Sequence, residues 1–224
     1  MQKFKLFIRN HPGIMRVCAA IYRFAGGNHL WNARHSVKQK YRGVFLRRSR
    51  ITVQGTDNVI EIGEGCRIRN LTIHIYGNHN RVLIDHDCVA VDLDIWLEDD
   101  GNTVTVGEHT WFDGKCHLAC TEGKTIQIGE RCLFSSEIVF RTGDSHSILD
   151  FEGKRINPAR DIAVGDHVWI CNQVIVLKGT EIGSDCVVGA GSLLAGKEYE
   201  DGSLIAGNPA KVIRRQISWD SRKL

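Results

Sequence analysis

The 224-residue chain contains only three prolines, no long apolar run and, in its first fifty residues, no acidic side chain. Proline removes a ladder hydrogen bond, so stacked strands are expected only away from Pro12, Pro158 and Pro209. No apolar run is long enough to cross a bilayer. The apolar N-terminal stretch is broken by Arg16 and Arg23, unlike a secretory signal. These absences predict a cytoplasmic protein.

Charge is distributed unevenly along the chain. Residues 1–50 carry twelve Lys or Arg, whereas the remaining 174 residues hold seventeen basic and twenty-six acidic side chains. The overall net charge of +3 therefore combines a strongly basic end with an acidic body. The basic N-terminal segment therefore favours an anionic partner. That partner is a membrane surface in peripheral contact, an acidic polymer or the acidic body of the chain itself. Solvated charge without a partner is the alternative.

A repeat of six residues runs through residues 164–194. Each block opens on an aliphatic residue, at Val164, Ile170, Val176, Ile182, Val188 and Leu194. A small or β-branched residue follows four positions later, at Val168, Val174, Thr180, Cys186 and Ser192. This period fits neither a helix nor simple strand alternation. It is typical of a solenoid whose coils each contain three short strands and stack with aliphatic side chains pointing inward.

A longer repeat of 22 residues begins at Ile51 and adds a polar corner to the same coil. One repeat position holds a small side chain in every copy, at Cys66, Cys88, Thr110 and Cys132, and Cys186 has the equivalent place later. Packing inside a narrow coil explains these cysteines. Since the sequence has no C-x-x-C pair, we predict neither disulfides nor a metal site.

Three parts follow from these patterns. Residues 51–199 are predicted to form the solenoid, interrupted by a polar excursion over residues 142–163, and long excursions of this kind are usually functional. Residues 200–224 form a basic tail. Residues 1–50 form a basic extension in which 12–25 are a short amphipathic helix, starting at Pro12 and ending at Gly26-Gly27, while 28–50 show no clear periodicity.

The predicted helix has one apolar face, made of Ile14, Val17, Cys18, Ile21, Tyr22 and Ala25. Arg16 and Arg23 lie on the opposite face. We expect this helix to cap the open end of the solenoid, where strand edges are otherwise exposed. Insertion into a membrane interface, with the arginines toward lipid headgroups, is the alternative.

Four motifs in this chain resemble those of the hexapeptide-repeat acyltransferases: Thr142-Gly-Asp-Ser-His146, Gly165-Asp-His-Val-Trp169-Ile, Ile182-Gly through Ser192, and Ala206-Gly-Asn-Pro-Ala-Lys211. The resemblance implies a left-handed parallel β-helix, a homotrimer and acetyl-CoA as the co-substrate. It is greatest for enzymes that O-acetylate bacterial surface polysaccharides such as capsules. A sugar or polysaccharide acceptor, anionic in the sialic-acid case, is therefore expected, and no nucleic acid.

By this resemblance His146 is the general base that takes a proton from the sugar hydroxyl in a ternary complex, without an acyl-enzyme. A positioned base contributes about 10²–10⁴-fold in rate, and an imidazole suits neutral pH. Asp144 either orients the His146 ring or forms a local Asx-type bond. His167 is a rival candidate for a direct role.

The resemblance also implies a donor site. Trp169 should face out of the coil and border the pantetheine and acetyl group, near the base of a neighbouring subunit. Asn172, Ala190 and Ala195 match positions that line the donor groove. Lys211, with Arg214 or Arg215, would meet the phosphates of the donor.

Two departures from the family pattern concern Cys171 and Lys115. Cys171 occupies a corner that is usually Gly, and Lys115 stands where galactoside-type members have an asparagine that polarises the acetyl oxygen. The oxyanion donor is therefore either a backbone amide or a side chain near His117. Three other functions stay open: N-acetylation of an amino sugar, a metal-dependent hydratase and a non-catalytic scaffold.

Overall fold

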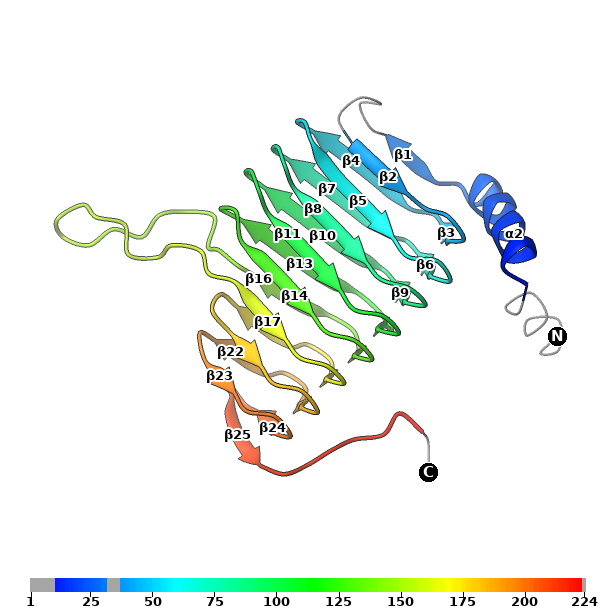
Figure 1. Cartoon of the computed structure of the whole chain (residues 1–224). Coiled ribbons are helices and arrows are strands. Elements are labelled where there is room, and N and C mark those ends of the chain that lie inside the picture. Colours follow the sequence, from blue (N-terminus) through cyan, green and yellow to red (C-terminus); the bar gives the residue numbers. More distant parts are fainter. Residues whose placement is uncertain (1–10, 32–36, 223–224) are drawn as a thin grey trace.

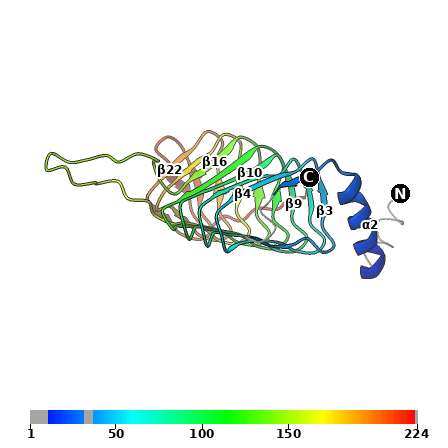
Figure 2. The same ribbon diagram turned by 90° about the horizontal axis from the view of Figure 1, so that it is seen from above.

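A computed structural model describes residues 11–31 and 37–222, so part of the predicted N-terminal extension lies outside the described residues. Helix α2 (Pro12–Ala25) lies at one end of a stack of short strands, and a long arm projects from the side of the stack (Figures 1 and 2). Three strands form each coil, and strands of successive coils pair in parallel. The predicted left-handed parallel β-helix is confirmed.

The coils build three sheets, named A, B and C here in the order in which the chain visits them. Sheet A consists of β1 (His29–Trp31), β4 (Arg50–Gln54), β7 (Thr72–Tyr76), β10 (Leu93–Glu98), β13 (Cys116–Thr121), β16 (Ile138–Arg141), β19 (Ile175–Leu177) and β22 (Leu193–Ala195). Sheet B consists of β2 (Val37–Lys40), β5 (Asn58–Ile62), β8 (Arg81–Ile84), β11 (Thr103–Val106), β14 (Thr125–Ile128), β17 (Ile162–Val164), β20 (Glu181–Ile182) and β23 (Glu198–Tyr199).

Sheet C consists of β3 (Phe45–Arg47), β6 (Arg67–Arg69), β9 (Val89–Val91), β12 (Trp111–Phe112), β15 (Leu133–Phe134), β18 (Trp169–Ile170), β21 (Val187–Val188), β24 (Leu204–Ala206) and β25 (Lys211–Arg214). Strand β25 turns back and pairs antiparallel with β24. The chain therefore passes an A–B corner, a B–C corner and a C–A corner in every coil.

Inward side chains of successive coils stack into aliphatic rows. In sheet A the row Ile51, Ile73, Ile95, Leu118 and Phe140 is in register and fully buried. Burying such a side chain stabilises the fold by about 1.5–3 kcal/mol. The six predicted aliphatic openers from Val164 to Leu194 are all buried as well, which confirms the six-residue period as a packing repeat.

The predicted small-residue position is also buried, and it carries a hydrogen bond. Cys66, Cys88 and Cys132 donate from Sγ to the corner carbonyls of Asp85, Gly107 and Gly165, at 2.9, 3.2 and 3.2 Å. Thr110 donates in the same way to Gly129 O at 3.0 Å. The residues at this position are therefore small and also donate a hydrogen bond. All eight cysteines are free thiols, and burial raises the pKa of Cys132 to about 12.

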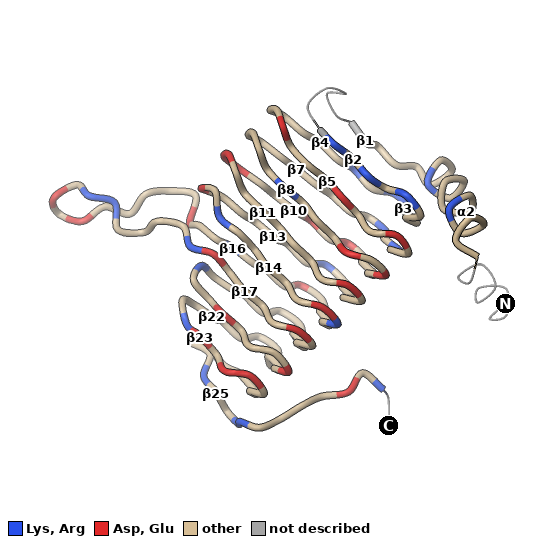
Figure 3. Tube along the Cα trace, in the orientation of Figure 1, with Lys and Arg blue, Asp and Glu red and all other residues tan. Residues whose placement is uncertain are grey.

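The solenoid extends beyond the predicted boundaries at both ends. Strands β1, β2 and β3 lie in the stretch 28–50 that showed no periodicity, and β24 and β25 follow residue 199. The periodicity was hidden because a polar residue takes an inward place: Gln39 is in register with the buried Ile60. Basic residues gather on α2, β2 and β3, whereas most acidic residues lie on the later coils (Figure 3).

Helix α2 packs against this end of the solenoid, with Arg16, Ala19 and Arg23 directed toward the coils. Arg16 donates two hydrogen bonds of 3.0 Å to Glu64, Arg23 donates to Tyr41 O at 2.5 Å, and Ala19 is the buried helix residue. The apolar stripe stays outside, with Ile14, Val17, Ile21 and Phe24 exposed by 42, 61, 64 and 95%. The two arginines decide the orientation because their partners lie on the solenoid.

Candidate functional site

The polar excursion leaves the solenoid at the A–B corner, between β16 and β17. It forms a narrow arm that extends away from the coils (Figure 1), with one antiparallel bridge between Leu149 and Arg155. Its two ends are joined because Arg160 N donates to Thr142 O at 2.9 Å. Thr142 itself is buried and accepts a hydrogen bond from Thr121 N at 3.0 Å. The base of the arm is thus part of the solenoid wall.

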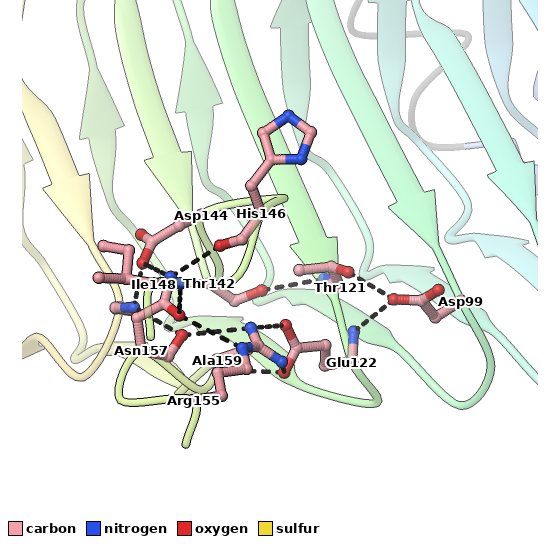
Figure 4. Close-up of polar contacts among 11 residues, drawn as sticks. Asp99, Thr121, Glu122, Thr142, Asp144, His146, Ile148, Arg155, Asn157 and Ala159 are labelled. Carbon is pink, nitrogen blue, oxygen red and sulfur yellow. Dashed lines mark hydrogen bonds and ion pairs between the residues drawn. The ribbon is translucent and has the colours of Figure 1, made fainter. Parts of the chain in front are cut away.

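Asn157 organises the base of the arm and is only 7% exposed. Its Oδ1 accepts from Ile148 N at 2.7 Å, and its Nδ2 donates to Asp144 Oδ2 and to the carbonyl of His146, both at 2.8 Å. Figure 4 shows these bonds converging on the one side chain. The backbone of His146 is therefore held by a buried amide.

Two ion pairs tie the arm to neighbouring coils. Arg155 donates to Glu122 at 3.0 and 2.5 Å, and the guanidinium lowers the pKa of this carboxyl. Lys178 pairs with Asp144, which lowers the Asp144 pKa. Asp144 therefore anchors the arm, and among the described residues no hydrogen bond joins it to the His146 imidazole. Neither Lys178 nor Asn157 had been singled out in the sequence, since both belong to the site only through the fold.

The imidazole of His146 is exposed and points away from this network (Figure 4). No hydrogen bond to the ring is present within residues 11–31 and 37–222. The side chain is thus an exposed imidazole on a fixed piece of backbone. Such a group is available to take a proton from a bound hydroxyl.

Trp169 lies on β18 in sheet C, facing outward as predicted, and a tryptophan of the tail covers it. The two rings of Trp169 and Trp219 are 5.9 Å apart at 43°. Trp219 also stacks on His167 at 4.3 Å and donates from Nε1 to His167 O at 2.7 Å. His167, at the B–C corner, is further bonded to Asp185 at 2.7 Å. His167 therefore holds the C-terminal tail through Trp219. Trp219, a tryptophan within the basic tail, was not among the predicted site residues.

The other predicted donor-site residues lie at different corners. Asn172 and Ala190 are exposed and stacked at the C–A corner, where Gly191 N donates to Asn172 O at 2.9 Å. Lys211 is exposed at the start of β25, beside Ala206. Ala195, in contrast, ends β22 at the A–B corner.

Cys171 is half-buried, and its amide keeps the regular bond to Val188 O at 2.9 Å. The departure from Gly therefore leaves the backbone of this corner regular. Desolvation raises the pKa of the Cys171 thiol. A raised pKa makes the thiolate scarcer at neutral pH, which disfavours a role as nucleophile.

Within one chain, sheet A separates His146 from the Trp169 side of the coil. His146 is on the arm at the A–B corner, whereas Trp169 is on sheet C and Asn172 and Ala190 are at the C–A corner. The predicted base and the predicted donor-site residues therefore lie on different flanks. Within the described residues of a single chain, the two are not brought together.

A cavity of about 310 Å³ opens on sheet A beside the arm, and His117 is among its lining residues. His117 Nδ1 lies 2.8 Å from Asp94 Oδ2. A larger open hollow of about 770 Å³ runs along sheet B and contains none of the predicted site residues. Lys115 is exposed in the turn before β13.

Within residues 11–31 and 37–222, no group of three or more His, Cys, Asp or Glu side chains is arranged to hold a metal ion. No helix in the same ranges is both long enough and apolar enough to span a bilayer.

Comparison with known proteins agrees with this architecture. Residues 161–196 match the family model for bacterial transferase hexapeptide (six repeats). The polysialic acid O-acetyltransferase of Neisseria meningitidis is 33% identical over 172 residues, covering 76% of this chain and 79% of the relative. That of Escherichia coli O1:K1 is 32% identical over 120 residues, covering 53% of this chain and 38% of the relative.

Two crystal structures of polysialic acid acetyltransferases have the same fold. The enzyme NeuO superposes with a TM-score of 0.74 at 28% identity, covering 88% of this chain and 82% of that one. The enzyme OatWY superposes with a TM-score of 0.72 at 28% identity, covering 88% and 90%. With its six-residue repeats, its β-helix and these relatives, the chain belongs to the hexapeptide-repeat acetyltransferases.

Proposed function

We propose that this enzyme transfers an acetyl group from acetyl-CoA to a hydroxyl of an acidic polysaccharide of the polysialic acid type. The observation that carries the proposal is His146, an exposed imidazole whose backbone is held by the buried Asn157. The two relatives named as polysialic acid O-acetyltransferases support the acceptor class.

In the proposed reaction His146 removes the proton of the sugar hydroxyl while the oxygen attacks the thioester carbonyl. The new C–O ester bond forms, the C–S bond breaks, and the CoA thiolate leaves and takes up the proton from the imidazolium. No acyl-enzyme is involved, and no cysteine is required. This agrees with the raised thiol pKa of Cys171, the half-buried cysteine beside Asn172.

The donor is proposed to lie along the Trp169, Asn172 and Ala190 side of the coil, with Lys211 near its phosphates. The exposed Ala190 leaves space at its corner, and Lys211 offers a cation on an exposed strand. The buried Nε1 of Trp169 has no hydrogen-bond partner among the described residues. An unpaired indole N–H is costly to bury, and an acceptor atom of the donor would reach it only with Trp219 moved off the Trp169 ring.

Because His146 and Trp169 lie on different flanks of one chain, we infer that the enzyme works as a homotrimer with each site shared between two subunits. The arm of one subunit would bring His146 to the Trp169 side of its neighbour. Cyclic oligomers use such head-to-tail contacts, in which two different surfaces meet. Ala195, at the A–B corner with His146, would then join the donor site from the arm-bearing subunit.

A peripheral membrane contact is the remaining partner that we propose. The exposed stripe of α2 presents Ile14, Val17, Ile21 and Phe24, within a segment of twelve basic and no acidic residues. An anionic bilayer complements both features. Co-sedimentation with anionic vesicles, and not with zwitterionic ones, is expected, and Phe24→Ser with Ile21→Ser should abolish it.

The proposed base is tested by His146→Ala, with His79→Ala on an exposed corner as the matched control. His146→Ala should lower kcat by about 10²–10⁴-fold while acetyl-CoA binding, measured calorimetrically, is retained. His79→Ala should behave like the wild type. Near-normal turnover of His146→Ala would refute the assignment. Mild alkali then separates O-acetylation from N-acetylation, because esters are hydrolysed and amides survive.

A further inference from the structure

The outer face of sheet A carries a hollow beside the arm whose shape follows from one small residue. Trp96, Ala119 and Arg141 are in register on β10, β13 and β16. Since Ala119 has a single methyl group between a large indole and a long guanidinium side chain, the row dips in the middle. The resulting cavity of about 310 Å³ also reaches Gly143 and Ser145, at the base of the arm. Ser145 directly precedes His146.

Arg141 is the cation that lines this cavity, and it has no acidic partner within residues 11–31 and 37–222. It is exposed, and no hydrogen bond or ion pair to it is present among the described residues. Arg155, on the arm, is in contrast paired with Glu122. A planar guanidinium without a partner is suited to bind a carboxylate through two parallel hydrogen bonds.

His117 supplies a fixed polar group on the next row. Its Nδ1 is 2.8 Å from Asp94 Oδ2, and His117 is only 23% exposed. Since Nδ1 is bonded to the carboxylate, Nε2 is the ring nitrogen left to bond a ligand. Glu98, a carboxylate, also lines the cavity wall, as does Thr121, whose hydroxyl donates to Asp99 Oδ2 at 2.7 Å. Both can accept hydrogen bonds from sugar hydroxyls. The cavity thus combines one free cation with several hydrogen-bonding groups.

An aromatic platform continues the cavity toward the N-terminal coils. The ring of Trp96 lies 5.1 Å from Tyr76 and 5.0 Å from His74, and the His74 and Tyr76 rings are 6.2 Å apart. All three are half-buried on the outer face of sheet A. Adjacent ring faces offer an apolar surface with polar edges, which suits the C–H face of a sugar ring.

We propose that sheet A holds the acceptor polymer, with Arg141 binding the carboxylate of an acidic sugar and Trp96 and Tyr76 carrying the residues that follow. The polymer would run across β16, β13, β10 and β7, with one sugar placed beside the arm that bears His146. This inference rests on the proposed function, since it names the acceptor subsite of the same reaction.

The carboxylate contact is tested with oligomers of sialic acid and with the same oligomers converted to methyl esters. The wild type should use the acid with a KM about tenfold to a hundredfold below that of the ester, as expected for a lost charge-assisted bond. Arg141→Gln should raise the KM for the acid by that factor and leave the KM for the ester and for acetyl-CoA unchanged. Arg141→Lys should restore part of the preference.

Arg81→Gln, an exposed arginine on sheet B, is the matched control and should keep the wild-type preference. Equal loss on acid and ester in Arg141→Gln would overturn the proposal, as would an unchanged preference for the acid. The aromatic platform is tested with oligomers of increasing length. The KM of the wild type should fall as the oligomer becomes longer, and this fall should disappear in Trp96→Ala. A length dependence like that of the wild type would refute the platform.

Calorimetric binding of sialic acid oligomers to His146→Ala distinguishes a wrong acceptor class from a wrong acceptor subsite. Binding that is lost in His146→Ala combined with Arg141→Gln supports the subsite even if His146 proves not to be the base. If no oligomer binds to the wild type or to His146→Ala, the acceptor class is wrong and the subsite falls with it. If oligomers bind equally with and without Arg141, the subsite alone is wrong.

Discussion

Mixed trimers of His146→Ala and Trp169→Ala should recover activity that neither variant has by itself. The two residues lie on different flanks of one chain, with sheet A between them. In a shared site, the base comes from one subunit and the donor wall from the next. A Trp169→Ala subunit still supplies His146, and a His146→Ala subunit still supplies Trp169. One orientation of a mixed pair therefore rebuilds an intact site.

The magnitude follows from counting the pairs in a ring. Any trimer that contains both variants has three contacts, of which one joins like subunits, one joins two damaged half-sites and one joins two intact half-sites. Purified mixed trimers should therefore have about one third of wild-type kcat. Loss of the base leaves about 10⁻²–10⁻⁴ of the wild-type rate, so the expected recovery stands well above the background.

The assay uses co-expression of the two variants with different affinity tags and purification over both tags in turn. Only mixed trimers are retained on both columns. Acetyl transfer to sialic acid oligomers is then measured as the release of free CoA thiol. Trimers that carry both changes on every chain serve as the control and should stay inactive. Mixed trimers no more active than their parents would refute the shared site, and a dimeric or monomeric mass in light scattering would refute the trimer.

Three further predictions concern the arm, its ion pairs and the core. Asn157→Ala should lower kcat more than tenfold and make the arm sensitive to proteolysis. The unfolding midpoint should change little, because the Asn157 amide holds the arm and not the coils. Protease resistance equal to that of the wild type would contradict this. Asp144 and Glu122 have lowered pKa values in the folded chain, so their anchoring is complete above the unfolded carboxyl values of about 4 and is lost as pH falls through the lower folded values. Protease sensitivity of the arm should therefore rise only below about pH 4, and a rise between pH 5 and 7 would contradict it. Thr110→Val should lower the free energy of unfolding by about 1–3 kcal/mol, measured in urea, because Gly129 O loses its donor, whereas Thr110→Ser should be closer to the wild type.

Local repetition explains why the solenoid could be predicted. The aliphatic openers and the small-residue position recur at fixed spacing, and each coil buries the same places as the coil before it. The stretch 28–50 escaped prediction because its inward side chains include Gln39, which breaks the aliphatic pattern while the backbone ladder continues. The hydrogen bonds made by the small-residue position were also not predicted. The sequence shows only that Cys and Thr are small, and the carbonyls that they bond belong to the next coil.

The coil, the place of the arm and the family motifs follow from the amino-acid sequence alone, because they depend on side-chain spacing within short segments. Which distant groups meet depends on the folded chain. Folding joins Asp144 to Lys178, lays Trp219 over Trp169, and turns the apolar stripe of α2 outward through Arg16 and Glu64. These contacts span tens of residues and depend on how coils stack and ends fold back, which no local pattern encodes.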